Sequence, residues 1–174
     1  MDGETEANNI AEPDERVAGT TCPFCLIVEG SIDAKVVYSD DRFLGVLDIN
    51  PANPGHVLLF PKFHYTSLTD MSDDLVSRMF SITKKLCSVL VETLHAKGFN
   101  IFLANGEVAG QKVPHVLVHI IPRYDHDGLA FAWKPKPTSD DYMKNVADAI
   151  KSYSVPEEKK PEVFYEIDED ERIA

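Results

Sequence analysis

Short stretches in which apolar and polar residues alternate predict the strands of this chain. The segment KVVYSDDRFLGVLDI (35–49) indicates a strand, a Ser-Asp-Asp turn and a second strand, which together predict a hairpin. A third strand is expected in HVLLFPK (56–62), where Pro61 ends it, and a fourth in NIFLAN (100–105). The segment HVLVHIIPR (115–123) predicts the fifth strand.

Helical spacing of apolar residues predicts one long helix over 70–97, with Ser72 as its N-cap and Gly98 marking its end. CPFCLIVEG (22–30) suggests a short helical turn, and a further helix is expected from Ser139 to about Tyr153. Strands on both sides of one long helix predict an α+β fold with a five-stranded antiparallel sheet and a C-terminal helix. The apolar stripe expected on the long helix consists of Leu75, Val76, Met79, Phe80, Ile82, Leu86, Val89, Leu90 and Leu94.

Acidic residues crowd the two ends of this chain of 174 residues, whose net charge is −12. We therefore expect disordered acidic tails at 1–19 and 155–174, around a folded domain at 20–133 and a linker with a helix at 134–154. The C-terminal tail holds one apolar cluster, Val163–Ile167, that could dock on a partner or on its own domain.

The charge and the hydropathy pattern also bear on partners and location. The acidic balance disfavours a nucleic-acid surface, because phosphates would be repelled. The sequence contains no apolar run of about 18 residues, so we expect no membrane span. The acidic, polar N-terminus argues against a secretory signal or a transit peptide, so we expect a cytoplasmic location, with the nucleus not excluded.

Cys22 and Cys25 form a Cys-Pro-Phe-Cys pair, which is typical of either a metal clamp or a redox dithiol. The redox motif opens a helix directly after a strand, whereas a charged tail without a strand pattern precedes this pair. A zinc ion would need two further ligands, for which His64 and His115 are candidates. Spacing alone leaves the choice open, because these residues lie on separate segments.

Side chains alternate along a strand, so His115, Leu117 and His119 are expected in one row, with Val116, Val118 and Ile120 facing the core. The surrounding segment GQKVPHVLVHIIPR (110–123) closely resembles the motif of the histidine triad family of nucleotide-binding proteins, which carry histidines at alternate positions. DINPANPGHVLLFPKFH (48–64) and ANGEVAGQ (104–111) resemble further family segments in the same order. The resemblance covers roughly residues 20–133, and CPFC with Trp133 resembles the zinc-containing, Hint-type branch.

The resemblance implies two sites. A structural zinc ion would be held by Cys22, Cys25, His64 and His115. A purine nucleotide would contact Phe24, Ile27, Val46 and Ile49 at the base, Asp48 at the ribose hydroxyls, and His56, Gln111, Lys112 and His119 around the phosphate, with Asn105 as a further nucleotide contact.

One position of the histidine row departs from the family in a way that bears on catalysis. In active relatives the middle histidine attacks phosphorus, and here Leu117, which has no lone pair, stands at that position. Lys112 and Ala104 also differ from the residues common in the family. We therefore expect a nucleotide-binding protein with absent or strongly reduced phosphoramidase and dinucleotide hydrolase activity, in which His119 retains any residual catalytic role.

Two alternatives remain open from the sequence. The chain could be an active nucleotide hydrolase or nucleotidyl transferase that uses His119 or water directly, or a non-catalytic interaction module whose acidic tails recruit partners. Relatives commonly pair through the long helix and the fourth strand. The resemblance therefore implies a homodimer, which would cover the exposed edge of NIFLAN.

Overall fold

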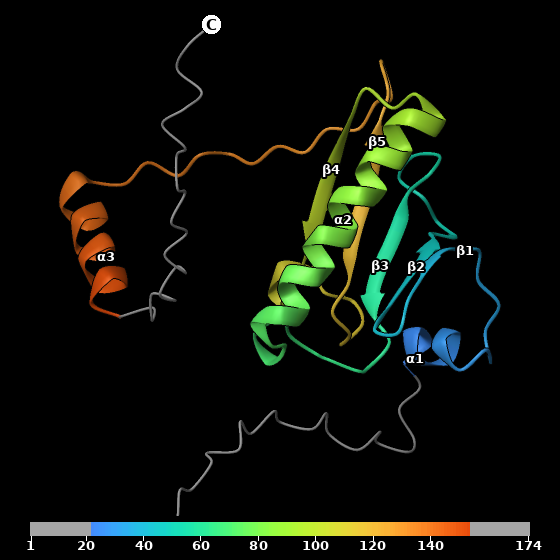
Figure 1. Ribbon diagram of the computed structural model, residues 1–174. Helices are drawn as coiled ribbons and strands as arrows, with labels where there is room; N and C mark the ends of the chain where they lie inside the picture. Colours follow the sequence, from blue (N-terminus) through green and yellow to red (C-terminus); the bar gives the residue numbers. More distant parts are fainter. Residues whose placement is uncertain (1–21, 154–174) are drawn as a thin grey trace, which may run out of the picture. The chain divides into compact units, whose positions relative to one another are not determined.

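The computed structural model describes residues 22–153 and contains one antiparallel sheet of five strands in the order β1-β2-β3-β5-β4 (Figure 1). The α+β fold expected from the sequence is confirmed, with one long helix and a C-terminal helix. The expected domain start at Thr20, both acidic tails and the Val163–Ile167 cluster lie outside the described residues. The strands are β1 (Val36–Ser39), β2 (Phe43–Leu47), β3 (Val57–Pro61), β4 (Gly98–Leu103) and β5 (Val118–Arg123). The helices are α1 (Pro23–Val28), α2 (Asp73–Leu94) and α3 (Asp140–Ser152), with short 3-10 turns η1 (Leu68–Asp70) and η2 (Glu107–Ala109).

The chain divides into two compact units, one ending at Ala130 and the other beginning at Phe131. The second unit contains α3, in which Ser139 caps the N-terminus by accepting from the Tyr142 amide at 3.2 Å. Apolar residues of this helix, among them Met143 and Ile150, are exposed. Within residues 22–153, no helix is both long enough and apolar enough to cross a lipid bilayer.

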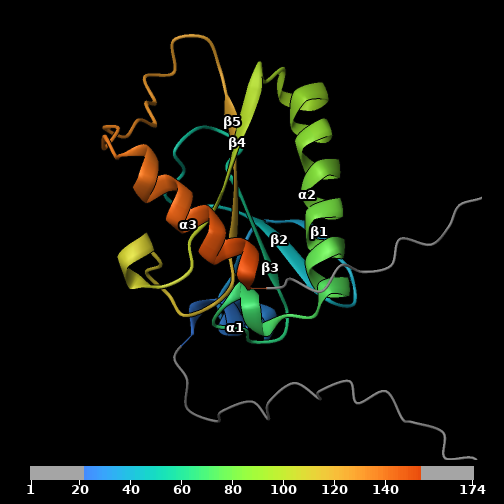
Figure 2. The same cartoon turned by 90° about the vertical axis from the view of Figure 1, so that its left-hand side faces the viewer.

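In the first unit, α2 lies along one face of the sheet, as the two views show (Figure 1, Figure 2). Alternate strand residues such as Val57, Leu59 and Ile120 pack with α2 into one core cluster. Their neighbours Leu58 and Phe60 belong to a second cluster, which includes Phe24 of α1. Because side chains alternate along a strand, the sheet separates a core beneath α2 from a core beneath α1.

Helix α2 is shorter than the sequence predicts. The N-cap is correct, because Ser72 Oγ accepts from the Leu75 amide at 3.4 Å, and Asp70 belongs to η1 instead. The predicted end at Lys97 is wrong: the helix ends at Leu94, and His95 follows with a φ of 55°. Gly98 is the first residue of β4 and pairs with Arg123 of β5, and the Lys97 amide donates to the Arg123 carbonyl. Hydrogen bonds to β5 therefore replace helical hydrogen bonds from Lys97 onward.

The expected apolar stripe on α2 is only partly buried. Leu75, Met79, Ile82, Leu86 and Leu90 are buried, as are Thr83 and Cys87, which the pattern did not predict. Phe80, Val89 and Leu94 are exposed. A groove of about 400 Å³ between α2 and β4 is lined by Phe80, Thr83, Lys84, Cys87, Ser88, Val91, Glu92, Phe99 and Ile101.

Strand β5 begins at Val118, not at His115 as the sequence predicts. The chain turns before it: the His115 amide donates to the Val113 carbonyl at 2.8 Å, and the Val116 amide donates to the Tyr65 carbonyl at 2.7 Å. The alternation of faces is nevertheless confirmed. Val116, Val118 and Ile120 are buried in the core beneath α2, and Leu117 packs against the cluster beneath α1.

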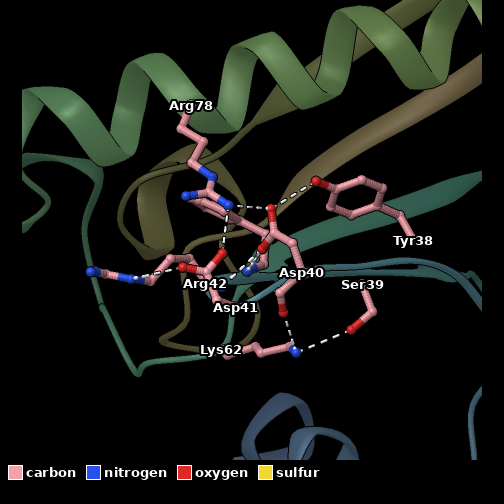
Figure 3. A network of polar contacts seen from close by, with 8 residues as sticks. Tyr38, Ser39, Asp40, Asp41, Arg42, Lys62 and Arg78 are labelled. Carbon is pink, nitrogen blue, oxygen red and sulfur yellow. Dashed lines mark hydrogen bonds and ion pairs between the residues drawn. The ribbon is translucent and has the colours of Figure 1, made fainter.

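A polar network ties the turn between β1 and β2 to α2 (Figure 3). Asp40 accepts from Tyr38 Oη at 2.7 Å and from the Phe43 amide at 2.7 Å, and Arg78 of α2 donates to it at 3.0 Å. Arg78 also pairs with Asp41 at 2.5 Å. Burial alone would raise the pKa of Asp40, but these donors bring it down to about 2. The network therefore fixes the turn at the end of the hairpin remote from Asp48.

Candidate functional site

Cys22, Cys25, His64 and His115 converge, with one ligand atom from each side chain within 4.8 Å of the others. Cys22 Sγ lies 3.4 Å from His115 Nδ1, and Cys25 Sγ lies 3.3 Å from His64 Nδ1. Sulfur and nitrogen ligands of a tetrahedral zinc ion would be about 3.6 Å apart, as follows from its bond lengths. The donors come from the N-terminus of α1, the segment after β3 and the segment before β5, and their spacing therefore suits a small tetrahedral cation.

The ring of His115 is oriented by the backbone. Its Nε2 donates to the Pro61 carbonyl at 2.9 Å, which leaves the lone pair of Nδ1 directed at the cysteines. Burial lowers the pKa of His115 to about 4, so the ring is neutral at physiological pH and able to ligate a metal. Phe24 and Phe60 pack against this ring, with centroid distances of 5.5 and 5.7 Å.

A second cluster joins Asp48, His56 and His119, which come from the ends of β2 and β3 and from β5. His56 Nε2 lies 3.1 Å from His119 Nδ1, and Asp48 Oδ2 lies 3.4 Å from His56 Nδ1. The Asp48 amide donates to the His56 carbonyl at 2.9 Å, which closes the loop between the two residues. The side chain of His56 is only 5% exposed and that of Asp48 16%, so all polar groups here act in a partly desolvated site.

Leu117 lies between His115 and His119 in the chain and packs against the core cluster beneath α1. Three of the residues expected at a purine base, Phe24, Ile27 and Val46, belong to or pack against that same cluster. Ile49 does not join them, because its side chain is 87% exposed. Phe24 and Val46 are thus buried, Ile27 is partly buried, and a leucine occupies the middle of the histidine row.

Two other predicted residues are engaged in loop contacts. The Gln111 side chain accepts from the Gly106 amide at 2.7 Å and donates to the Thr66 carbonyl at 2.9 Å, so it braces the loop before β5. Asn105 accepts from the Leu68 amide at 3.2 Å. These contacts give Gln111 and Asn105 a structural role, and their predicted contacts with a nucleotide stay predictions.

Lys112 is exposed and lines a hollow of about 540 Å³ with Glu107, Gly110, Gln111 and Pro114. Its charge reaches the histidine pair: burial lowers the pKa of His119, Asp48 opposes this shift, and the Lys112 ammonium reinforces it. His119 is therefore a neutral imidazole beside a cation at physiological pH.

Sequence reasoning missed the groups that orient these side chains. The Pro61 carbonyl fixes His115, and the Ala52 amide donates to His56 Nδ1 at 3.2 Å. Both are backbone groups, which carry no side-chain signal in the sequence. Phe60, fully buried against Phe24 and His115, is the one missed side chain that the alternation in HVLLFPK could have indicated.

Comparisons with known proteins agree with this architecture. The HIT domain matches residues 29–126, more than half of the chain, which therefore belongs to the HIT family. An uncharacterised HIT-like protein of Methanocaldococcus jannaschii is 50% identical over 107 residues, covering 62% of this chain and 82% of that protein. An adenosine 5′-monophosphoramidase of Candida albicans is 33% identical over 136 residues, covering 75% and 90%.

Solved structures of HIT proteins share the fold. A Bacillus subtilis member superimposes with a TM-score of 0.72 at 33% identity, covering 78% of this chain and 98% of that one. A zinc-bound histidine triad protein from Mycobacterium smegmatis gives a TM-score of 0.61 at 35% identity, covering 77% and 98%.

Proposed function

We propose that this chain is a zinc-stabilised HIT protein that binds purine nucleotides and has little or no phosphoramidase or dinucleotide hydrolase activity. The observation that carries the proposal is Leu117, packed against an apolar cluster at the middle of the histidine row. Its side chain has no lone pair with which to attack phosphorus and no proton to donate.

Nucleotide binding is supported by the groups around that leucine. Ile27 is partly buried and packs against the cluster of Phe24 and Val46, so it offers apolar surface for a base, and the Asp48 carboxylate offers an acceptor for ribose hydroxyls. The Candida albicans relative is named for activity on an adenosine monophosphate compound. The base and ribose contacts do not use Leu117, so binding should survive the loss of the nucleophile.

The expected loss of hydrolysis follows from the size of the effect that a covalent nucleophile has on turnover. Removing the covalent nucleophile of a well-studied hydrolase lowers turnover on the order of a million-fold, which is roughly 8 kcal/mol of transition-state stabilisation. Positioning and electrostatic groups that remain can retain on the order of a thousand-fold over water. His119 is the residue in this chain that would supply such residual catalysis, as a proton donor to the leaving group.

A structural zinc ion is supported by the donor set of Cys22, Cys25, His64 and His115, whose sulfur–nitrogen distances of 3.3 to 3.8 Å match tetrahedral ligation. The zinc-bound relative from Mycobacterium smegmatis supports the same assignment. All four ligand positions would be filled by protein, so the ion would crosslink three segments of the chain and leave no position for a reacting water.

The experiment compares wild type with Leu117→His and Leu117→Asn in the full chain. Turnover of an adenosine phosphoramidate should be at or near background in wild type and in Leu117→Asn, which is polar but not nucleophilic. Leu117→His should raise turnover by about a hundredfold or more, because it restores a neutral nitrogen beside His119. Stabilisation by AMP, measured as a thermal shift, should be present in wild type.

Two results would contradict the proposal. Wild-type turnover equal to that of active relatives would refute the inactive site, and it would favour hydrolysis through His119 or water. The absence of any thermal shift with AMP, GMP or other purine nucleotides would refute nucleotide binding and leave an interaction module as the better explanation.

A homodimer is proposed through α2 and β4. The groove between these elements is bordered by exposed apolar residues, Phe80, Phe99 and Ile101, which water would otherwise contact. Strand β4 is also an edge of the sheet, with hydrogen-bonding groups to cover. Light scattering of the full chain would test this: a monomeric mass would exclude the dimer.

A further inference from the structure

Asp127, in the turn after β5, accepts from several N–H donors although its side chain is only 7% exposed. Arg123 donates to it from Nε at 2.6 Å and from Nη2 at 2.8 Å. The amides of Leu129 and Tyr124 donate at 3.0 and 3.2 Å, and Asn53 Nδ2 donates at 2.9 Å. The Arg123 guanidinium is the main reason why the pKa of this carboxyl lies well below its usual range, so Asp127 is a fixed acceptor at physiological pH.

Asn53 comes from a distant part of the sequence, the loop of residues 48–56 that joins β2 to β3. The residue is 7% exposed, and its amide nitrogen donates to the Pro122 carbonyl of β5 as well as to Asp127, both at 2.9 Å. A side-chain amide carries two N–H donors, and two acceptors meet them here. Asn53 therefore ties the loop to the end of β5.

Such anchors matter because the backbone of this loop has few donors. Pro51 and Pro54 have no amide hydrogen, and the Pro54 carbonyl accepts from the Tyr124 hydroxyl at 2.9 Å. Gly55 has a φ of +88°, and a Cβ added there would clash with Leu94 of α2. Contacts with β5, with the turn after it and with α2 therefore define the path of the loop.

Hydrogen bonds lead from Asn53 to Asp48 at the other end of the loop. The Asn53 carbonyl accepts from the His56 amide at 3.0 Å, and the His56 carbonyl accepts from the Asp48 amide at 2.9 Å. Asp48 Oδ1 accepts from the Asn50 amide at 2.8 Å, which orients the carboxylate. The position of Asp48 therefore depends on the backbone that Asn53 anchors.

We propose that Asn53, held by the Asp127 carboxylate and the Pro122 carbonyl, is a positioning residue that keeps Asp48 where it accepts from the ribose hydroxyls of a bound nucleotide. Asn53 thereby sets the preference of the site for a ribonucleotide over a nucleotide without these hydroxyls. Its N–H donors are directed at the protein, so it acts through the loop and not on the ligand. The role of Asp48 in this inference rests on the proposed function, whereas the anchoring of the loop does not.

Calorimetric titration of the full chain with AMP and with 2′,3′-dideoxy-AMP measures this preference. Asn53→Ala removes both donors and should weaken AMP by about fivefold, the effect of one hydrogen bond, with less than about a twofold change for dideoxy-AMP. Asn53→Asp has nearly the same volume but places a second carboxylate against Asp127. Because like charges repel, Asn53→Asp should weaken AMP more than Asn53→Ala does.

A double-mutant cycle with Asp48→Asn separates positioning from a general loss of structure. If Asn53 acts through Asp48, the loss of AMP affinity caused by Asn53→Ala should disappear in the Asp48→Asn background. Damage to the whole fold would instead weaken AMP and dideoxy-AMP alike in both backgrounds. Arg78→Ala is the matched control, because it breaks a polar network at another turn (Figure 3). It should leave the ratio of the two affinities unchanged.

Amide hydrogen exchange provides a second measurement, made without nucleotide. The amides of Asp48 and His56 form hydrogen bonds within the loop. Both should exchange about tenfold faster in Asn53→Ala than in wild type, because the loop opens locally more often. In Arg78→Ala they should exchange at the wild-type rate.

Three outcomes would overturn the inference: an equal loss of affinity for AMP and dideoxy-AMP in Asn53→Ala, a loss that persists beside Asp48→Asn, or unchanged exchange of the Asp48 amide. Wild-type affinity for AMP in Asn53→Asp would exclude the part assigned to Asp127. If exchange rises as expected but wild type does not bind AMP, the proposed function and the ribose preference both fail while the anchoring of the loop stands.

Discussion

His115 and His119 lie four residues apart in the same segment, yet they belong to two different clusters of polar side chains. His115 joins Cys22, Cys25 and His64 in a cluster where every side chain offers a lone pair to one point. His119 joins His56 in a pair whose facing ring nitrogens, Nδ1 of His119 and Nε2 of His56, lie 3.1 Å apart. Leu117 separates them and contributes to neither set of polar contacts.

The difference lies in how each outer histidine is fixed. The Pro61 carbonyl accepts from His115 Nε2 and leaves the lone pair of Nδ1 directed at the cysteines, whereas the Ala52 amide donates to Nδ1 of His56. A backbone acceptor thus orients the ring of His115, and a backbone donor orients the ring of His56. The following changes break or sharpen that contrast.

The largest effect is expected at the cation site. Cys22→Ser removes a buried sulfur ligand, so the bound zinc should be lost and the free energy of unfolding should fall by about 4 kcal/mol, a size associated with loss of a metal. Metal content and denaturant unfolding would measure both changes.

Cys87→Ala is the control for this prediction, because Cys87 is also a buried free cysteine but packs in the core beneath α2. It should lower stability by about 1 kcal/mol through lost packing and keep one zinc per chain. Full zinc content in Cys22→Ser would show that the cluster does not require this ligand.

A smaller effect is expected at the cluster of Asp48, His56 and His119. Asp48→Asn keeps an oxygen for the Asn50 amide, which donates to Asp48 Oδ1 at 2.8 Å, but removes the charge that the proposed function assigns to the ribose hydroxyls. AMP should bind about 10-fold to 100-fold more weakly, which corresponds to a hydrogen bond to a charged group. Calorimetric titration would measure the change.

Dideoxy-AMP tests the cause of that loss. Lacking both ribose hydroxyls, it should bind wild type and Asp48→Asn with nearly equal affinity. An equal loss of affinity for both nucleotides would place Asp48 elsewhere in the site, and zinc content should not change in either protein.

The sequence predicted the elements of the fold because their signals are local. The Ser-Asp-Asp turn, the Ser72 N-cap and the alternation in HVLLFPK are each set by neighbouring residues. It failed where long-range pairing decides the outcome. Gly98 is a typical helix terminator in sequence, but in the structure it is a strand residue that pairs with Arg123 of β5. The Val116 amide donates to the Tyr65 carbonyl, so β5 begins later than the sequence predicts.

The candidate sites show the same division. Residue types and a family resemblance indicated the members of both clusters. The structure places the four metal-ligand candidates together, and it also places Asp48, His56 and His119 together. Side-chain reasoning did not anticipate that Gln111 and Asn105 are used by loop contacts. The donor to His56 Nδ1 is the backbone amide of Ala52, so no pattern of residue types could predict this contact.

The smallest effect is expected far from both clusters, in the network of Asp40, Asp41 and Arg78 (Figure 3). The Arg78 side chain is 42% exposed, so Arg78→Ala should lower the free energy of unfolding only slightly at neutral pH. The pKa of Asp40 is held at about 2, below its ordinary 3.8, so its stabilising contribution is present above pH 3.8 and is lost as the pH falls toward 2. Without Arg78 that pKa should rise, and wild type and variant should converge in stability across this window. Unfolding curves between pH 2 and pH 5 would measure the convergence; a constant difference would mean that Arg78 stabilises through packing and not through its charge.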